Sequence, residues 1–343
     1  MRSSQVTIKD IARELGISPS TVSRALKDHP DISAGTKKAV TELAEKLNYT
    51  PNSIALSLRQ SKSNTIGVII PEIIHFFFST VISGIEDIAY DAGYSVIVSQ
   101  SNESFEREVL NTKALYNNRV DGMLISLSRE TVNYEHLQFI HDRGMPMVFF
   151  DRIAEGINCS KVIVDDFGGS FEATEHLIKQ GYKRIAHLSG PTSLAISQNR
   201  LNGYKAALEK NNMVFDEKIV MRDHASEDEQ MAKRLTTKLL SSSNPPDALF
   251  AINDVAALGA MLAAKEKGLK IPGDFAIVGF SNWRFTELTE PPMTTVNQPG
   301  FELGQEAARL LIKEIESKEG ESVEVVTKTL TTKLVVRGTS VKR

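Results

Sequence analysis

The pattern of apolar and polar residues predicts three short helices near the start of the chain. Apolar residues recur at helical spacing over residues 8–15, after the capping-box sequence TIKD, and Gly16 follows as a stop signal. Ser18 and Pro19 are typical of the start of a second helix, and Ser33 is a suitable cap for a third. Two short helices joined by a tight turn, with a third packed across them, indicate a helix-turn-helix unit.

From residue 65 onward, short apolar strands alternate with amphipathic helices. The segments TIGVIIP, SVIVSQ, DGMLISL and PMVFFD are typical of buried strands, and STVISGIEDIAYDAG is typical of a helix. After residue 164 the alternation restarts with strands RIAHLSG, DALFAIN and DFAIVGF and with helices over residues 167–180, 198–212 and 254–267. This repetition predicts parallel sheets. Because about ten strands are too many for one compact sheet, we expect two similar lobes.

A short helical pattern, TPNSIALSLRQ, lies between these two regions. It starts at Asn52 and places Ile54, Ala55 and Leu58 at helical spacing. An isolated helix needs about 12 to 15 residues to be even marginally stable in water, and this pattern covers only about two turns. The segment is therefore expected to become helical only where a partner covers Leu58.

The composition is that of a soluble globular protein with about two or three domains. Of the 343 residues, 41% are hydrophobic and 24% are charged. No run approaches the ~18 apolar residues of a membrane span, and the start MRSSQVTIKD lacks signal-peptide features, so we expect a cytoplasmic protein with no membrane partner. The single cysteine, Cys159, excludes an internal disulfide, and without clustered His or Cys we expect no metal and no cofactor.

Charge is distributed unevenly between the two regions. Residues 1–61 contain nine basic and six acidic residues, a net charge of +3, whereas the remainder contains 31 basic and 37 acidic residues, a net charge of −6. A basic head on an acidic body is consistent with a nucleic-acid-binding module, although an excess this small is also found on ordinary solvated surfaces.

The second predicted helix carries most of the candidate DNA contacts. In a helix-turn-helix unit this helix lies in the major groove, with its first residues nearest the bases. Arg24 can donate two hydrogen bonds to guanine, and serine hydroxyls suit phosphate oxygens. The alternative is an ordinary three-helix unit with Arg24 on a solvated face. The candidate contacts of the head are Thr7, Ser18, Pro19, Ser20, Thr21, Ser23 and Arg24.

The run IKDIARELGISPSTVSRAL, followed by ISAGTKKAV and LNYTPNSIALSL, is very similar to the amino-terminal headpiece of the lactose-repressor and galactose-repressor family of bacterial transcription regulators. The similarity continues through nearly the whole chain. It implies a DNA-binding headpiece over residues 1–50, a hinge helix and linker over 51–62, and an effector-binding and dimerisation core over 63–343.

In this family the hinge helix forms when two subunits sit together on operator DNA, and a leucine matching Leu58 enters the minor groove. An inserted leucine unstacks a base step and bends the duplex, so DNA would cover this side chain. The resemblance therefore adds Asn52, Ala55 and Leu58 to the expected DNA contacts. The alternative is that Leu58 packs on the headpiece.

The core resembles the two-lobed α/β fold of periplasmic sugar-binding proteins, with parallel sheets and three crossings between the lobes. By analogy the crossings lie near residues 164, 292 and 324, and the effector binds between the lobes at the carboxyl ends of the strands. The expected boundaries are an N-lobe of about 63–164 and 293–324 and a C-lobe of about 165–292 and 325–343.

Matching the family motifs to this sequence gives the expected effector contacts. Phe77 and Phe78 would stack on a sugar or base, or else belong to the core. Asp151 and Arg152 would bind neighbouring hydroxyls, or else form a structural ion pair. Arg200 and the pair Asn253 and Asp254 match cleft positions, although Asp254 is equally suited to cap the following helix, and Gln298 is a further candidate.

The sequence departs from the family pattern after the strand AIVGF. Many members carry a Tyr-Asp pair there, whereas this chain has Ser281, Asn282 and Trp283, so the usual acidic anchor is missing. The two polar side chains can still hydrogen-bond a polyol, and the indole can stack on a sugar ring. Because Leu194 and Ile196 are apolar where the purine-sensing branch has polar contacts, we expect a sugar effector.

The resemblance implies a repressor that binds a near-palindromic operator as a homodimer and responds to a small-molecule effector. The alternative is a regulator of the same family whose core senses a phosphoprotein or a non-sugar metabolite. An enzyme is not expected, because no nucleophile elbow, P-loop or GxGxxG motif accompanies Asp165, Asp166, His187 or Cys159. The short tail GTSVKR has no leucine heptads, so we expect no tail-mediated tetramer.

Overall fold

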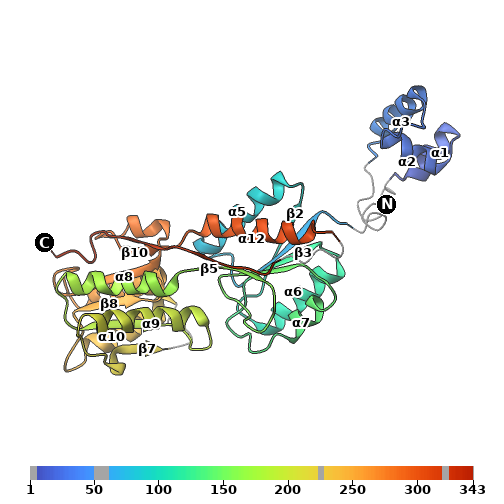
Figure 1. The fold of residues 1–343 in the computed structure, drawn as a ribbon. Helices are drawn as coiled ribbons and strands as arrows, with labels where there is room; N and C mark the ends of the chain where they lie inside the picture. Colours follow the sequence, from blue (N-terminus) through green and yellow to red (C-terminus); the bar gives the residue numbers. More distant parts are fainter. Residues whose placement is uncertain (1–5, 50–61, 223–227, 319–323, 343) are drawn as a thin grey trace. The chain divides into compact units, whose positions relative to one another are not determined.

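The computed structural model describes residues 6–49, 62–222, 228–318 and 324–342. The chain divides into two compact units, Met1–Asn64 and Thr65–Arg343 (Figure 1). Each unit has its own hydrophobic core.

The first unit contains the three predicted helices, α1 (Ile8–Leu15), α2 (Pro19–Leu26) and α3 (Ala34–Lys46). Local sequence explains their ends. Ser18 and Ser33 each accept a hydrogen bond from a backbone amide in the first turn of the helix that they precede, and Gly16 ends α1 in the left-handed conformation with φ of 64°. The apolar stripes meet in a small core made of Ile11, Ala12, Val22, Ala25, Val40, Leu43 and Ala44.

The second unit contains two six-stranded sheets, which confirms the predicted α/β two-lobed fold. The first sheet has the order β11-β5-β4-β3-β1-β2 and the second β12-β10-β9-β8-β6-β7. All neighbouring strands are parallel except β10 and β12. The strands of the first sheet are β1 (Thr65–Ile70), β2 (Ser95–Gln100), β3 (Gly122–Ile125), β4 (Met147–Phe150), β5 (Ser160–Val164) and β11 (Thr327–Leu330). Those of the second are β6 (Ile185–Ser189), β7 (Val220–Arg222), β8 (Ala248–Ala251), β9 (Ala276–Ser281), β10 (Thr294–Asn297) and β12 (Lys333–Val335).

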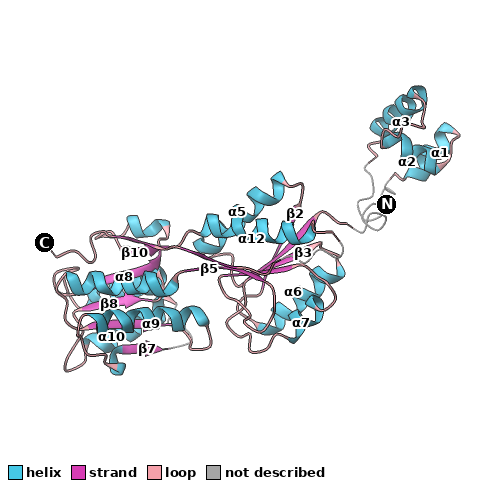
Figure 2. Ribbon diagram, viewed as in Figure 1, coloured by secondary structure: helices cyan, strands magenta, loops and turns pink. Residues whose placement is uncertain are grey.

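Helices cover both faces of each sheet, so each lobe has two hydrophobic clusters (Figure 2). The buried strands are accordingly nearly continuous apolar runs, as expected for parallel sheets. The first lobe is covered by α5 (Phe76–Asp91) and α12 (Gly300–Ile315) on one face and by α6 (Phe105–Asn117) and α7 (Glu135–His141) on the other. The second is covered by α8 (Asp166–Lys179) and α9 (Ala195–Lys210), and by α10 (Glu229–Leu240) and α11 (Asp254–Glu266). Two short 3-10 helices, η1 (Glu217–Ile219) and η2 (Arg284–Glu287), also belong to this lobe.

The structure corrects two of the three predicted crossings between the lobes. The first crossing follows β5 at residue 164, as expected. The second was expected near residue 292, but β10 pairs with β9, so the second lobe continues to residue 297 before α12 joins the first lobe. The third was expected near residue 324, but β11 pairs with β5, so the chain crosses after residue 330 and pairs again in β12.

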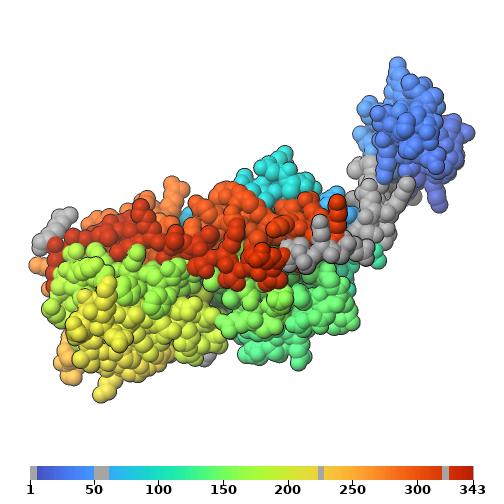
Figure 3. Space-filling model, viewed as in Figure 1, coloured from blue at the N-terminus to red at the C-terminus, as the bar shows by residue number. Residues whose placement is uncertain are grey.

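The physical reason for these errors is that a short strand joins whichever sheet offers an open edge in register, and apolar periodicity does not identify that sheet. The consequence is visible in Figure 3, where the C-terminal residues, in red, run along both lobes.

Candidate functional site

The first candidate surface is the exposed side of α2 and its N-cap. Ser18 Oγ accepts a hydrogen bond from the Thr21 amide at 3.1 Å and lies 2.7 Å from Ser20 Oγ, which gathers hydroxyls at the amino end of the helix. The positive end of the helix dipole lies at the same place, so this end favours an anion such as a phosphate. Among the predicted contacts, Pro19, Ser20 and Arg24 are exposed, and Thr21 and Ser23 are half-buried.

Thr7 has a structural role in addition to its predicted DNA contact. Its hydroxyl donates to Asp10 Oδ2 at 2.6 Å, and its amide donates to the same atom at 3.0 Å, which completes the capping box of α1. These hydrogen bonds lower the pKa of Asp10 below its ordinary value. The predicted contacts Asn52, Ala55 and Leu58 lie outside the described residues.

The second candidate site is a cavity in the core unit, at the carboxyl ends of strands from both lobes. It contains nine of the eleven predicted effector contacts. The cavity is small, about 70 Å³, because side chains from both lobes converge on it. The lining residues are His75, Phe77, Phe78, Asp151, Arg152, Ile196, Arg200, Ile252, Asn253, Ser281, Trp283 and Gln298.

The aromatic residues of the cavity come from both lobes. Phe77 and Phe78 meet edge to face with ring centroids 5.4 Å apart, and both also pack in the core of the first lobe with only 8% and 4% exposure. The two phenylalanines therefore belong to the core of the first lobe and also line the cavity. The ring of His75, in the first lobe, lies 5.5 Å from that of Trp283, in the second, so this pair joins the two sides of the cavity.

Asp151 and Arg152 enter the cavity from the end of β4. Asp151 has a left-handed backbone with φ of 58°, which turns the chain sharply at the strand end. Arg152 Nη1 donates to both carboxylate oxygens of Glu103, at 2.9 and 2.7 Å, so the arginine lines the cavity and belongs to a buried ion pair at once. Burial is the largest single influence on Glu103 and acts to raise its pKa, but the charge and hydrogen bonds of Arg152, together with the amide and charge of Arg129, outweigh burial and lower the pKa below its ordinary value.

Arg200, on α9, is held from three sides. Its Nε and Nη2 lie 2.7 Å from Asp166 Oδ1, its Nη1 donates to the carbonyl oxygen of Ile252 at 2.6 Å, and its guanidinium lies 3.7 Å from the centre of the Phe280 ring. Burial raises the pKa of Asp166, and the charge of Arg200 opposes that rise. The guanidinium is therefore presented to the cavity in one orientation.

Asn253 and Asp254 are adjacent residues with different surroundings. Asn253 lines the cavity and caps α11, because its Oδ1 accepts a hydrogen bond from the Ala256 amide at 2.8 Å. Asp254 does not supply the N-cap of α11, which corrects that alternative. It is not among the residues that line the cavity, and it accepts hydrogen bonds from the Trp283 amide at 2.8 Å and the Thr295 hydroxyl at 2.5 Å. Its carboxylate holds the loop that carries Trp283.

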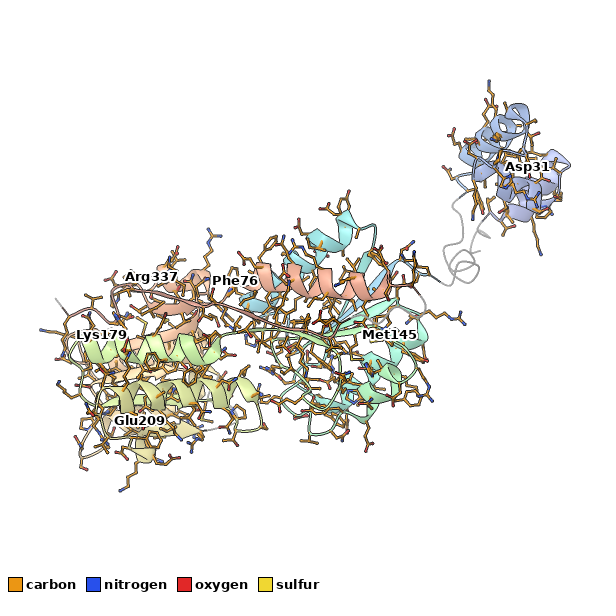
Figure 4. The ribbon with its side chains drawn as sticks, in the orientation of Figure 1. Asp31, Phe76, Met145, Lys179, Glu209 and Arg337 are labelled. Carbon is orange, nitrogen blue, oxygen red and sulfur yellow. The ribbon has the colours of Figure 1, made fainter. Side chains whose placement is uncertain are left out.

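Asn282 is the other predicted effector contact that does not line the cavity. Ser281 and Asn282 have φ values of 120° and 60°, and this turn directs the two side chains apart. Ser281 Oγ lines the cavity and donates to Gln298 Oε1 at 2.7 Å. The Asn282 amide instead donates to Asn297 Oδ1 at 2.9 Å and accepts from Arg337 Nη2 at 3.0 Å, and Arg337 lies in the second lobe (Figure 4).

Three lining residues, His75, Ile196 and Ile252, were not among the predicted contacts. His75 lies in the loop between β1 and the phenylalanines of α5, so its proximity to Phe77 was the available signal. The two isoleucines supply apolar walls, which a search for polar contacts overlooks.

Two further searches cover only the described parts of the chain. Among those residues, no helix combines the length and the apolar character needed to cross a bilayer. Within the same residues, no group of three or more His, Cys, Asp or Glu side chains is arranged to hold a metal ion.

Comparison with known proteins adds to this geometry. Residues 63–335 match the family described as periplasmic binding proteins and sugar binding domain of LacI family, and residues 7–52 match bacterial regulatory proteins, lacI family. A ribose operon repressor from Halalkalibacterium halodurans is 36% identical over 335 residues, which cover 97% of this chain and 97% of that protein.

Solved structures match over the same length. The lac repressor dimer bound to operator and the anti-inducer ONPF is 28% identical, with a TM-score of 0.85, and the match covers 99% of this chain and 100% of that one. A complex of the transcriptional regulator CelR with cellobiose is 29% identical, with a TM-score of 0.74, and the match covers 98% and 100%. The headpiece and the two-lobed core are thus matched together, and the chain belongs to the lacI family of bacterial regulatory proteins.

Proposed function

We propose that this protein is a cytoplasmic transcription repressor that binds a near-palindromic operator as a homodimer and is controlled by a sugar bound between the lobes of its core. The observation that carries the proposal is the convergence of polar and aromatic side chains from both lobes on one cavity, in a chain that also presents an exposed recognition helix. Residues 1–50 would bind DNA, residues 51–62 would form the hinge, and residues 63–343 would bind the effector and the second subunit.

The DNA contacts divide by chemistry. Arg24 is exposed on α2 and would read a guanine, whereas Ser18, Thr21 and Ser23 would contact phosphates near the amino end of the helix. Pro19 and Ser20 would face the bases, and Thr7 would add a backbone contact. The hinge residues Asn52, Ala55 and Leu58 would reach the minor groove at the centre of the operator.

Two kinds of side chain in the cavity favour a sugar. Trp283 and Phe77 offer aromatic faces for the apolar side of a sugar ring, and Asp151, Arg152 and Asn253 offer groups that hydrogen-bond hydroxyls. The relative named ribose operon repressor and the CelR complex with cellobiose support the same class. We assign Asp254 and Asn282 to holding the Trp283 loop, and the nine other predicted residues to the effector.

The DNA-binding part is tested by selection from a random double-stranded library at a stated salt concentration. We expect enrichment of a pseudo-palindrome, because a twofold dimer places two recognition helices about one helical turn apart. Recovery of binding that is independent of sequence and falls steeply with salt would contradict the proposal and indicate an architectural DNA protein.

The effector part is tested with the single tryptophan, Trp283, whose fluorescence reports on the cavity. Titration with sugars, sugar phosphates and nucleobases should give a saturable change for one class, and Arg200→Ala should abolish it. A suitable control is Arg184→Ala, which breaks the ion pair with Asp216 in the same lobe, away from the cavity. Absence of any change across the panel would favour a phosphoprotein or a non-sugar metabolite instead.

A further inference from the structure

Both arginines that line the cavity already have a carboxylate partner. Arg152 is paired with Glu103, and Arg200 is paired with Asp166, and neither carboxylate lines the cavity. Each pair is confined to one lobe. The cavity therefore presents two guanidinium groups, and the charge of each is balanced by a carboxylate that does not line the cavity.

The loop that carries Glu103 has an unusual backbone conformation. Asn102 and Glu103 are two consecutive residues with left-handed backbones, with φ values of 50° and 60°, directly after β2 and Ser101. Glu103 is 9% exposed and, besides the two bonds from Arg152, accepts a hydrogen bond from the Arg129 amide at 2.7 Å. The Arg129 guanidinium also lies 3.5 Å from Glu103 Oε1, so this carboxylate faces two arginines, of which only Arg152 lines the cavity. A strained loop is thus used to place a carboxylate against the arginine of the cavity.

Asp166 plays the corresponding part in the second lobe. It is the first residue of α8, it is 4% exposed, and it lies 2.7 Å from two nitrogens of Arg200. Arginine does not lose its proton in proteins, so the carboxylate compensates a permanent charge.

Charge around the cavity is therefore not positive, although two arginines line it. Asp151 adds a third carboxylate to Glu103 and Asp166, which balances the guanidinium of Arg129 beside Glu103. His75 Nε2 lies 2.9 Å from Glu72 Oε2. An anionic ligand would have to give up its hydration without gaining an uncompensated cation. A hydroxyl group has no such cost, because it accepts hydrogen bonds from a guanidinium and donates to a carboxylate.

We propose that the effector is an uncharged polyhydroxylated compound, a sugar without a phosphate or carboxylate group, and that Glu103 sets this selectivity by neutralising Arg152 without touching the ligand. The inference rests on the proposed sugar-controlled function. Glu103 is thus a positioning residue, and its effect should appear as a change in selectivity between neutral and anionic ligands.

The test uses the full-length protein and isothermal titration with matched ligand pairs, D-ribose with D-ribose 5-phosphate and D-glucose with D-glucose 6-phosphate. We expect the neutral member of a pair to bind at least about tenfold more tightly. In Glu103→Gln the preference should fall by about tenfold or more, because the guanidinium charge of Arg152 is then uncompensated in a partly desolvated site.

A matched control is Glu108→Gln. Glu108 is fully buried in the same lobe and accepts hydrogen bonds from the Ser128 amide at 2.6 Å and from the Thr131 hydroxyl at 2.9 Å, but it pairs with no arginine of the cavity. The Glu108→Gln variant should prefer the neutral ligand as strongly as the wild type does. The double variant Glu103→Gln with Arg152→Gln separates charge from structure, since removal of both charges should restore the preference for the neutral ligand.

Thermal unfolding shows whether each variant is folded. If Glu103→Gln does not fold, Asp166→Asn replaces it, because the same loss of preference is then expected through Arg200. Tighter binding of the phosphorylated sugars by the wild type would overturn the inference and leave the proposed function standing. An unchanged preference in Glu103→Gln would overturn the role of Glu103. Binding of no sugar in either form would overturn the proposed function together with the inference.

Discussion

Asp254 and His187 are both fully buried in the second lobe, and burial moves their pKa values in opposite directions. Desolvation raises the pKa of Asp254 to about 6, although its hydrogen bonds from Thr295 and Trp283 oppose the rise. Desolvation lowers the pKa of His187 to about 4, against the hydrogen bond that its ring makes with the Phe250 carbonyl. Both shifts follow from removing a charged form from water. Each makes stability depend on pH with a definite sign.

For Asp254, the folded state holds the proton more tightly than the unfolded chain. Its contribution to stability is therefore complete below pH 3.8 and is lost as pH rises through about 6. In Asp254→Asn this loss disappears, so the free energy of unfolding of the variant, relative to the wild type, should rise by about 2 kcal/mol between pH 4 and pH 7. Denaturant unfolding at both pH values measures it. Glu209→Gln, an exposed change on α9 (Figure 4), is the control, and a constant difference for Asp254→Asn would contradict the argument.

For His187, the folded state favours the neutral ring. Its contribution is complete above pH 6.5 and is lost as pH falls toward about 4. His187→Phe retains the stacking on Phe250 and Tyr204, whose centroids lie 4.9 and 5.2 Å from the imidazole, but it does not titrate. The variant should cost stability at pH 7 because the Phe250 carbonyl loses a partner, and this cost should shrink by about 3 kcal/mol toward pH 4. If the difference in unfolding free energy between His187→Phe and the wild type stayed constant from pH 7 to pH 4, the imidazole would not be the cause of the pH dependence.

At the scale of the elements, the crossing of α5 and α12 depends on glycines. A Cβ on Gly84 would lie 2.0 Å from the Phe301 carbonyl oxygen, and a Cβ on Gly304 would lie 2.0 Å from the Val81 carbonyl oxygen. The two helices therefore approach each other backbone to backbone. This packing fixes α12, which begins two residues after the lining residue Gln298, against α5, which carries Phe77 and Phe78.

Gly304→Ala should therefore destabilise the core by about 1 to 3 kcal/mol, because the clash is with a carbonyl group that the helix cannot move. Denaturant unfolding of the full chain measures this. Gly273→Ala is the control and should change stability by no more than about 0.5 kcal/mol, because its Cβ would meet the Lys270 Cβ at 3.5 Å and the Lys270 carbonyl oxygen at 3.9 Å, which are ordinary contacts. Equal effects of the two substitutions would show that close helix packing is not the reason for Gly304.

At the scale of the whole molecule, regulation requires that the effector cavity and the DNA-binding surface influence each other, although they belong to separate units. Coupling between two binding sites is reciprocal: if the effector changes operator affinity by some factor, the operator must change effector affinity by the same factor. Titrations of effector with and without operator, and of operator with and without effector, should therefore give equal ratios.

Leu58→Ala tests the proposed link between the units. We expect operator affinity to fall about tenfold and DNA bending to decrease, because the wedge that unstacks a base step is lost. Effector affinity without DNA should stay unchanged, which controls for damage to the core. Binding isotherms and a gel-mobility bending assay provide the measurements. Unchanged affinity together with unchanged bending would remove Leu58 from the DNA contacts.

Local information sufficed for much of this protein. The three helices of the headpiece follow from caps and apolar stripes within a few residues of one another, such as Ser18 with Thr21, and the structure confirms them. The strand and helix alternation of the core is equally local. Because the carboxyl ends of parallel strands lie together at one edge of each sheet, residues just after strands, such as Arg152 in the first lobe and Asn253 in the second, were expected at the space between the lobes, and both line the cavity.

Long-range pairing was not accessible in the same way. The partners Glu103 and Arg152 are 49 residues apart, and Asp166 and Arg200 are 34 apart. The side chain of Asp254 accepts a hydrogen bond from Thr295, 41 residues away, and β10 and β11 each join a different lobe from the one expected. Such choices depend on the register of short strands and on which buried polar groups find partners. Periodicity places a residue on a face of a helix or strand, but packing in three dimensions selects what that face meets.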